Sequence, residues 1–287
     1  MLITLREILE IAERGKFAIG AFNSPTLESA RAALEAAEEL NTPIILQHAE
    51  VHFEINPIEI IGPVLVELAK NANVPVAVHL DHGTSIDTVK KAIDLGFSSV
   101  MIDASHKPFN ENVNIVKEVV EYAHSCNVSV ESELGMLTST GIGGEETPGN
   151  VEDEQSDGYT DPDAAKSFVE QTNIDALAAS FGTAHGIYIT EPVLDIPRLE
   201  KIYSLTGIPV VMHGGSGLSD EEYEKTISAG VRKINYYSYA AITGGQAIKE
   251  HVRNNPHPLY HELTEIARLA MKEDIKRVIK LFSKSQI

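Results

Sequence analysis

Residues 74–83 read VPVAVHLDHG, an apolar run that ends in the polar group His79, Asp81 and His82 and then Gly83. Near-continuous apolar runs of this kind suit strands that are buried on both faces, as in a parallel sheet. The polar residues come where the apolar run stops. We therefore expect a buried strand whose carboxyl end presents polar side chains at one edge of a sheet.

The same pattern recurs along the whole chain, and each run is followed by a segment with helical spacing. The other runs are FAIGAFN (17–23), PIILQHA (43–49), SSVMIDAS (98–105), VSVESELG (128–135), ALAASFGTAHG (176–186), IPVVMHGG (208–215) and VRKINYYS (231–238). Helical segments include 25–40, 85–95, 111–123, 161–171 and 219–229. Strands and helices alternating in this number predict an α/β fold, a (β/α)8 TIM barrel, as a single domain over 1–287. A doubly wound open sheet is the alternative.

Two parts of the chain depart from this alternation. Residues 138–160, TSTGIGGEETPGNVEDEQSDGYT, are rich in glycine and acids and lack an apolar period, so we expect a mobile active-site loop. Residues 240–287 follow the last strand and predict additional C-terminal helices. Their apolar stripe either packs on the barrel or meets another subunit, and it consists of Leu259, Leu263, Ile266, Ala270, Val278 and Phe282.

The composition excludes several kinds of partner. In 287 residues, 42 Asp and Glu outweigh 23 Lys and Arg, which gives a formal net charge of -19. This field repels phosphate backbones and anionic lipids, so neither nucleic acid nor a membrane surface is expected as a partner. The lone Cys126 excludes an internal disulfide and cysteine-based zinc sites. The amphipathic, acid-containing start does not resemble a secretory signal, and no apolar stretch is long enough to span a membrane, so we expect a cytoplasmic chain.

Three predicted strands end in a histidine that is followed by glycine. These histidines are His82, His185 and His213. In TIM barrels the carboxyl ends of the strands meet at one mouth, where the chemistry takes place. Neutral imidazole is a common zinc ligand, and three protein ligands with one open position are typical of a catalytic zinc site. Because Asp81 and His82 are neighbours, both can face the site only if the strand bends there.

A second pattern at the same mouth predicts anion binding. HGGSG at 213–217 precedes a capped helix and offers a row of backbone N–H groups. Asn235 and Ser238 end the following strand. Phosphate sites in TIM barrels commonly lie after these last two strands. Backbone dipoles can hold an anion here even though the whole chain is acidic.

Taken in order, HLDHG, GTAHG and HGGSG make the chain resemble the class II, metal-dependent ketose-bisphosphate aldolases. The resemblance extends from AFN (21–23) through MIDASH, ESELG and the GGEE loop to KIN (233–235). It implies reversible aldol cleavage of a phosphorylated ketose, such as fructose 1,6-bisphosphate, to dihydroxyacetone phosphate and an aldehyde. It further implies a Zn²⁺ cofactor, a role in carbohydrate metabolism such as glycolysis, and a homodimer or homotetramer.

The resemblance also assigns roles to individual residues. It makes Asp81 the catalytic acid and base, and His82, His185 and His213 the zinc ligands. It makes Asp103 and Glu133 ligands of a second divalent ion or of an alternate zinc position. In the loop, Glu145 and Glu146 match acids of which one helps to move a proton. It also implies that the phosphate of dihydroxyacetone phosphate is bound by Gly186, Gly214, Gly215, Ser216, Asn235 and Ser238.

Two positions depart from the family pattern. Ala49 stands near the end of the second strand, where serine is common, and Tyr237 stands where fructose enzymes have aspartate and tagatose enzymes alanine. Tyr237 adds bulk and an aromatic face beside the substrate. These changes favour an altered preference for the aldehyde half, with fructose 1,6-bisphosphate a weaker substrate than another ketose. The alternative substrates are tagatose bisphosphate and a ketose 1-phosphate.

Three alternatives of other kinds remain at this point. A Schiff-base aldolase would use Lys233, which shares a strand face with Asn235. A metallohydrolase on the same barrel usually needs His-x-His on the first strand, which here reads Ala21-Phe22-Asn23. A non-catalytic barrel that serves as an assembly subunit would have no physical reason to keep Asp81 and all three histidines.

Overall fold

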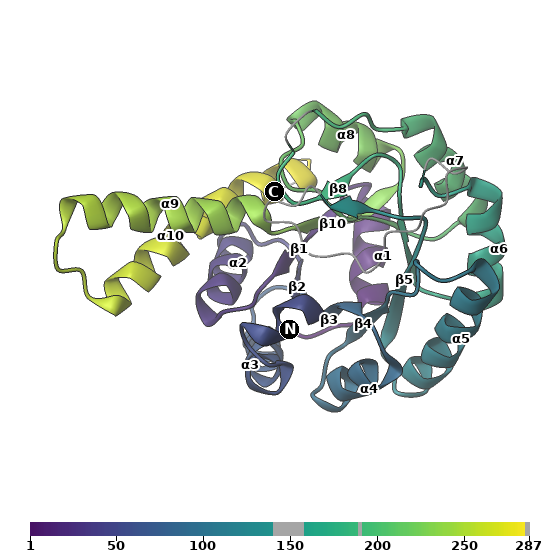
Figure 1. Ribbon diagram of the computed structural model, residues 1–287, viewed down its shortest axis with the longest axis horizontal. Helices are drawn as coiled ribbons and strands as arrows, with labels where there is room; N and C mark the ends of the chain where they lie inside the picture. The colour runs from purple at the N-terminus through teal and green to yellow at the C-terminus, as the bar shows by residue number, and fades with distance from the viewer. Residues whose placement is uncertain (140–157, 189–190, 285–287) are drawn as a thin grey trace.

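The computed structural model describes residues 1–139, 158–188 and 191–284 and contains a closed parallel barrel (Figure 1). Around the barrel the strand order is β1-β10-β9-β7-β5-β4-β3-β2. The strands are β1 (Ile19–Asn23), β2 (Ile44–Ala49), β3 (Val76–Gly83), β4 (Ser99–Ile102), β5 (Ser129–Leu134), β7 (Ala176–Ala179), β9 (Val210–Met212) and β10 (Val231–Tyr236). The (β/α)8 TIM barrel is confirmed, and the open sheet is wrong because β1 and β10 pair with each other.

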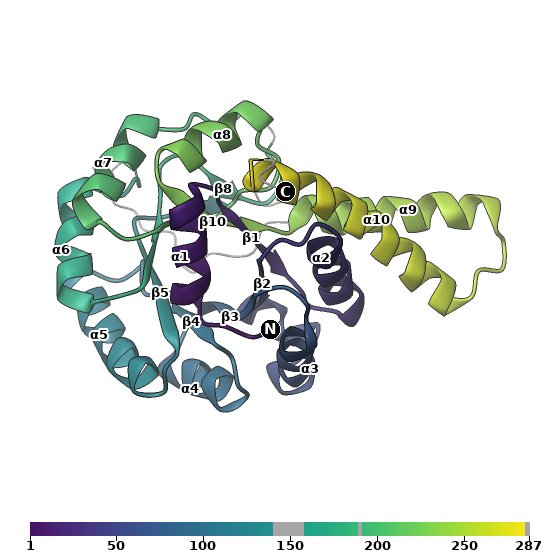
Figure 2. The same cartoon turned by 180° about the vertical axis from the view of Figure 1, so that it is seen from behind.

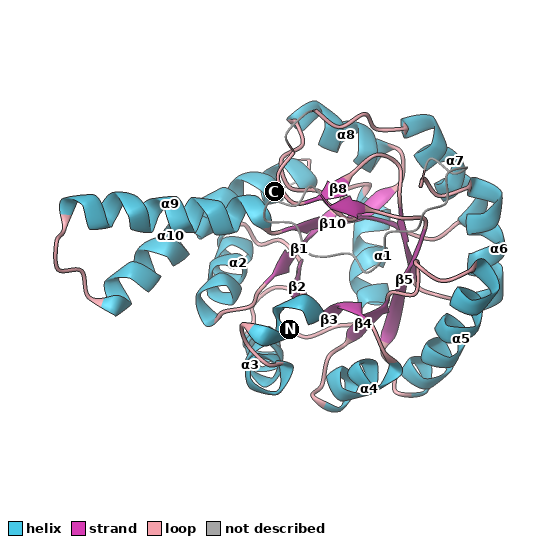
Figure 3. Ribbon diagram, in the orientation of Figure 1, coloured by secondary structure: helices cyan, strands magenta, loops and turns pink. Residues whose placement is uncertain are grey.

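Helices surround the strands on the outside (Figure 3). They are α2 (Leu27–Glu39), α3 (Ile58–Asn71), α4 (Ile86–Asp94), α5 (Phe109–Ser125), α6 (Pro162–Thr172), α7 (Ile196–Thr206) and α8 (Asp220–Ser228), with a 3-10 turn, η1 (Glu50–Glu54), after β2. Several begin where a side chain accepts a hydrogen bond from the first turn, as Ser85, Asp161 and Ser219 do. The sequence patterns therefore locate these helices through their caps as well as their apolar faces.

An additional helix, α1 (Leu5–Gly15), precedes the barrel and closes its amino-terminal end (Figure 2). Its buried face carries Leu5, Ile8 and Leu9. These side chains join the interior of the barrel, where Ala21 and Ala77 are small enough to leave room for them. The polar site at the opposite end of the strands is thus separated from solvent on this side by an apolar plug.

The chain after β10 forms α9 (Ser238–Asn254) and α10 (Tyr260–Phe282), a helical hairpin that projects from the barrel (Figure 1). The second half of α10 returns to the barrel and buries Ile275, Val278 and Phe282. The second half of the predicted stripe therefore packs on the barrel, whereas Leu259 is 57% exposed and lies with Tyr260 at the turn of the hairpin, so contact of the first half with another subunit stays a prediction. Among the described residues no helix combines the length and apolarity needed to cross a membrane.

Two predicted segments differ from their expected course. The run 176–186 divides into β7 and the two-residue strand β8 (Ala184–His185), and β8 pairs with β6 (Thr138–Ser139) outside the barrel. The run 98–105 is a strand only as far as Ile102. Most of the predicted loop, 140–157 with Glu145 and Glu146, lies outside the described residues. β6 joins the start of this loop to the strand that carries His185.

Candidate active site

The carboxyl end of β3 bends so that Asp81 and His82 both contribute to the mouth of the barrel. His82 has a φ of 46°, in the left-handed region that residues other than glycine seldom adopt. The register with β4 shifts between Leu80 and Gly83. A side chain at Gly83 would come within 2.6 Å of the carbonyl oxygen of Met101. The predicted bend is therefore present, and the close approach of β4 requires glycine immediately after it.

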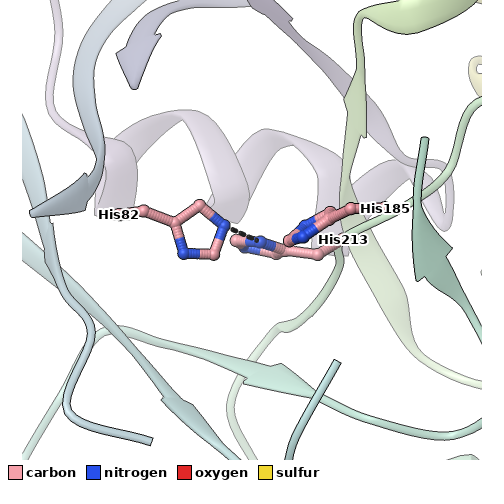
Figure 4. A group of neighbouring side chains, drawn as sticks. All are labelled: His82, His185 and His213. Carbon is pink, nitrogen blue, oxygen red and sulfur yellow. Dashed lines mark hydrogen bonds between the residues drawn. The ribbon is translucent and has the colours of Figure 1, made fainter. Parts of the chain in front are cut away.

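The three strand-end histidines converge at this mouth (Figure 4). The ring centroid of His82 lies 5.1 Å from that of His185 and 4.7 Å from that of His213. One ring nitrogen from each lies within 4.8 Å of the others, and His185 and His213 are buried. The barrel thus brings together three potential metal ligands from β3, β8 and the end of β9.

Two of these imidazoles are each fixed by a carboxylate. His82 Nδ1 lies 2.9 Å from Asp103 Oδ2, and His213 Nε2 lies 2.8 Å from Glu131 Oε1. An ionised carboxylate only accepts hydrogen bonds, so these two ring nitrogens carry the hydrogens. The remaining nitrogens, His82 Nε2 and His213 Nδ1, face each other at 2.9 Å. Two lone pairs cannot face each other so closely without a proton or a metal cation between them.

The electrostatics follow from burial and from the neighbouring acids. Burial alone would lower the pKa of His82, but the carboxylates of Asp81 and Asp103 outweigh it and raise this pKa to about 10. Burial and the neighbouring His82 hold the pKa of His185 well below its usual range. Burial lowers the pKa of His213 as well, so His82 is the one ring of the three whose pKa is raised.

Asp81 is completely buried and held by amide groups from three strands. Its carboxylate accepts hydrogen bonds from Asn23 Nδ2 at 3.0 Å, Gln47 Nε2 at 3.1 Å and Asn235 Nδ2 at 3.2 Å. Burial opposes its ionisation, but the positive charges of His82 and its neighbours outweigh burial and lower the pKa of Asp81. The result is a carboxylate that is ionised and fixed in direction beside the histidines.

Asp103 and Glu133 form a second group of potential metal ligands together with His82, again with ligand atoms within 4.8 Å of one another. Complete burial and the nearby charge of Asp103 raise the pKa of Glu133 well above its usual range. Asp103 also accepts two hydrogen bonds from Ser105, one from the backbone N–H of Ser105 and one from its hydroxyl. His82 is therefore shared between two potential metal positions.

A pocket lies beside the histidines and contains most of the residues predicted to hold phosphate. Its lining comprises Asn23, His185, Gly186, Gly214, Ser216, Asn235, Tyr236, Tyr237 and Ser238. Gly214 has a φ of 64°, and a side chain there would come within 2.3 Å of the Ala184 carbonyl oxygen. The backbone of HGGSG is therefore packed directly against β8.

One signal for this pocket was absent from the sequence prediction. The amino terminus of α9 begins at Ser238, which itself lines the pocket. The first N–H groups of a helix have no partner inside the helix and form a partial positive charge. This end of α9 therefore adds a partial positive charge beside the pocket. The strand-to-helix junction at 237–238 could have indicated this.

Gly215 does not line the pocket as its sequence motif suggests, whereas Tyr237 lies where its motif predicts. Gly215 is absent from the lining of the pocket, and a side chain there would meet Ile234 and the backbone of Asn235. Tyr237 lines the pocket, and its ring centroid lies 4.9 Å from that of His52 on η1. Tyr237 thus faces the site, as its position in the strand-ending motif predicts.

The residues that sequence reasoning missed are the ones that support the predicted ligands. Glu131 holds His213, while Asn23 and Gln47 hold Asp81. The sequence held a partial indication of these supporting residues. Glu131 and Glu133 are two residues apart and so share one face of their strand, and Asn23 and Gln47 lie at strand ends as the histidines do. The contact partners, however, come from strands that are far apart in the sequence.

The chain is similar to known proteins over nearly its whole length. Residues 3–286 match the family model for "Fructose-bisphosphate aldolase class-II". A fructose-bisphosphate aldolase of Staphylococcus epidermidis is 40% identical over 99% of this chain and 98% of that protein. One from Geobacillus stearothermophilus is 43% identical over 89% of this chain and 87% of that protein.

A solved structure agrees with this assignment. The crystal structure of the YdjI aldolase from Escherichia coli K12 superposes with a TM-score of 0.84, at 34% identity, and covers 98% of this chain and 97% of that one. The barrel strands and the three converging histidines all lie within residues 3–286, the range that matches the family model. The chain therefore belongs to the class II fructose-bisphosphate aldolase family, a family of carbon–carbon lyases.

Proposed function

We propose that the chain reversibly cleaves fructose 1,6-bisphosphate to dihydroxyacetone phosphate and an aldehyde phosphate, with Zn²⁺ held by His82, His185 and His213. The observation that carries the proposal is the convergence of three imidazoles beside the ionised Asp81, next to a pocket lined by backbone and hydroxyl donors. The relatives from Staphylococcus epidermidis and Geobacillus stearothermophilus are both named fructose-bisphosphate aldolase, which supports the substrate.

The donor set fits a zinc ion. Nitrogens bound to one tetrahedral zinc at the usual bond length lie about 3.3 Å apart. The facing nitrogens of His82 and His213 lie 2.9 Å apart, so these two rings need to separate by only a few tenths of an ångström, and the ligand atom of His185 lies within 4.8 Å of both. A bound zinc would supply positive charge that stabilises the negative charge developing on the ketose oxygens. Asp103 and Glu133 would hold a second divalent ion or an alternate zinc position with His82.

Asp81 is the residue that we assign to proton transfer. In the cleavage direction its carboxylate accepts the proton of the C4 hydroxyl, the C3–C4 bond breaks, and the C2 carbonyl takes up the electron pair. In the condensation direction Asp81 returns the proton to the new hydroxyl. Its three amide hydrogen bonds fix its direction before substrate binds, and the positive charge of His82 and its neighbours keeps it ionised, so it can act as a general base.

The pocket lined by Gly186, Gly214, Ser216 and Ser238 supports binding of the phosphate of dihydroxyacetone phosphate. Asn235 also lines it, and Gly215 would contribute through its backbone alone. The positive end of α9 favours an anion at this position. The phosphate would thereby fix the ketose with its carbonyl toward the histidines.

Other expectations belong to the same proposal. We assign residues 1–287 to one catalytic domain, with 138–160 as its active-site loop and 240–287 as its C-terminal helices. We further propose a cytoplasmic homodimer or homotetramer that binds neither nucleic acid nor membranes, in keeping with the net charge of -19.

The alternatives have less support. The relatives' names favour fructose bisphosphate over a tagatose bisphosphate or a ketose 1-phosphate, so the altered preference that Tyr237 suggested is not adopted. A Schiff base on Lys233 would need a neutral, accessible amine. Lys233 is completely buried and lies 2.9 Å from Glu131. The intact site argues against a non-catalytic subunit.

Metal removal tests the proposal. EDTA treatment should abolish cleavage of fructose 1,6-bisphosphate, and added Zn²⁺ or Co²⁺ should restore it. A panel of phosphoketoses run in parallel, with metal analysis of each preparation, identifies the preferred substrate. Full activity in metal-free protein, or a covalent adduct on Lys233 after borohydride treatment with substrate, would overturn the zinc mechanism.

A further inference from the structure

A layer of charged side chains lies inside the barrel, directly beneath the histidines. TIM barrel interiors are normally filled by branched apolar residues. Here His79, Glu131 and Lys233, from β3, β5 and β10, are all completely buried. Burying charges is costly unless they are paired, so a layer of this kind requires an explanation beyond packing.

Glu131 is the centre of this layer because its two oxygens have different partners. Oε1 accepts a hydrogen bond from His213 Nε2 at 2.8 Å. Oε2 lies 2.9 Å from the ammonium of Lys233 and 3.6 Å from His79 Nε2. The Lys233 charge balances the Glu131 charge, so the pair adds no net charge beneath the site.

The contact with Glu131 determines which nitrogen of His213 carries the hydrogen and which nitrogen keeps a lone pair at the mouth. With the hydrogen on Nε2, the neutral ring has its lone pair on Nδ1, the atom that faces His82 Nε2. If His213 carried its hydrogen on Nδ1 instead, that nitrogen could not bind a metal ion. Hydrogen bonds from a ligand's second nitrogen to a carboxylate are known to fix the tautomer and raise ligand basicity.

We infer that Glu131 is a positioning residue that fixes the metal-binding tautomer of His213, and that the contact with Lys233 holds the Glu131 carboxylate in place for this purpose. The inference rests on the proposed metal site. It explains why the buried charged layer lies under His213 and why neither Glu131 nor Lys233 needs to touch substrate. It also assigns a role to Lys233 other than Schiff-base formation.

The test is the zinc dissociation constant of Glu131→Gln, measured by competition with a chromophoric chelator. The amide keeps the shape of the side chain but can donate to His213 Nε2, so zinc affinity should fall about 10–100-fold. Lys233→Met should weaken binding in the same direction. The matched control is Ser132→Ala, because Ser132 is the next residue on β5, is equally buried and bonds to the Ile102 carbonyl instead. This control should bind zinc as the parent does.

A measurement on the unmutated protein covers the case in which these variants do not fold. Long-range ¹H–¹⁵N correlation of the histidine rings in the zinc-loaded chain should show His213 protonated on Nε2. A proton on Nδ1, or a Glu131→Gln variant that binds zinc as tightly as the parent, would overturn the inference. Failure of the parent to bind zinc at all would instead contradict the proposed function.

Discussion

His82 combines an unfavourable backbone conformation with two favourable contacts. A left-handed conformation costs a residue other than glycine about 1–2 kcal/mol. At a φ of 46° His82 can face His213 with one nitrogen and Asp103 with the other. Neighbouring Asp81 then also faces the mouth, which an extended strand would prevent. The strained backbone at His82 therefore allows two residues that are adjacent in the sequence, Asp81 and His82, to face the mouth together.

Replacing Asp81 tests its chemical role at this scale. Asp81→Ala should retain fold and zinc content, while turnover falls by about 10²–10⁴, the usual contribution of a positioned acid or base. The measurements are steady-state kinetics and metal analysis on the same preparation. Turnover close to that of the parent would remove Asp81 from proton transfer.

Removing one histidine tests the metal site. His185→Ala should lose zinc, because an open site with three protein ligands cannot spare one. His106→Ala provides a control at the same mouth, since His106 lies outside both groups of potential ligands in the described residues. Metal content by atomic emission should be unchanged in the control, and retention of zinc by His185→Ala would mean that the ligands are different.

At the scale of elements, α1 is attached to the barrel through one acidic residue as well as through its apolar face. Glu13 accepts hydrogen bonds from Arg232 Nε at 2.7 Å and from the Tyr203 hydroxyl at 2.5 Å, and it also contacts Lys16. It thereby links α1 to β10 and α7. The plug beneath the barrel is held in position by this contact in addition to hydrophobic burial.

The charge of Glu13 makes this contribution dependent on pH. Partial burial opposes its ionisation, but hydrogen bonds from Lys16, Tyr203 and Arg232 outweigh burial and lower the pKa of Glu13 from 4.5 to about 2. A pKa that is lower in the folded state stabilises the protein above the unfolded value. That stability is lost as pH falls from about 4.5 toward 2.

We therefore expect Glu13→Gln to lower the free energy of unfolding by about 1–3 kcal/mol at neutral pH. The difference from the parent should shrink below pH 4.5. Urea denaturation at several pH values measures it. Glu10→Gln is the control on the same helix, since Glu10 is exposed and its contact with Arg14 is 3.7 Å long. If both substitutions lowered the free energy of unfolding equally, or if the effect of Glu13→Gln did not change with pH, the proposed role of Glu13 would be contradicted.

At the scale of the whole molecule, the α9–α10 hairpin is the part that departs most from a compact barrel (Figure 2). Its base packs on the barrel and on α2, whereas its turn exposes Leu259 and Tyr260 at 57% and 80%. An isolated projecting hairpin buries little of its own apolar surface. This shape agrees with the proposed association of several subunits.

Light scattering tests that association. A homodimer or homotetramer should have two or four times the 31.2 kDa mass of one chain. The measurement should be repeated over a range of concentrations, because assembly depends on mass action. A species of single-chain mass at every concentration would reject it.

The strand-ending motifs by themselves predicted the barrel and the meeting of His82, His185 and His213. Both follow from local information: apolar runs fix the strands, and parallel strands all end at the same mouth. Most of the residues that line the pocket beside the histidines were also singled out from the sequence, because HGGSG and the end of β10 are neighbours in such a barrel, while their binding of phosphate stays a prediction. Gly215 is the exception, since the side of the turn it faces depends on packing against Ile234.

Tertiary structure alone decided which polar groups support these ligands. Glu131 reaches His213 across β7, and Asp81 is held by side chains from β1, β2 and β10. The sequence lists such residues as strand ends but does not pair them. Strand patterns fix which face a side chain occupies, whereas contact across the barrel depends on closure, register and the bend at His82. Those are properties of the assembled sheet, set by packing between strands that are far apart in the chain.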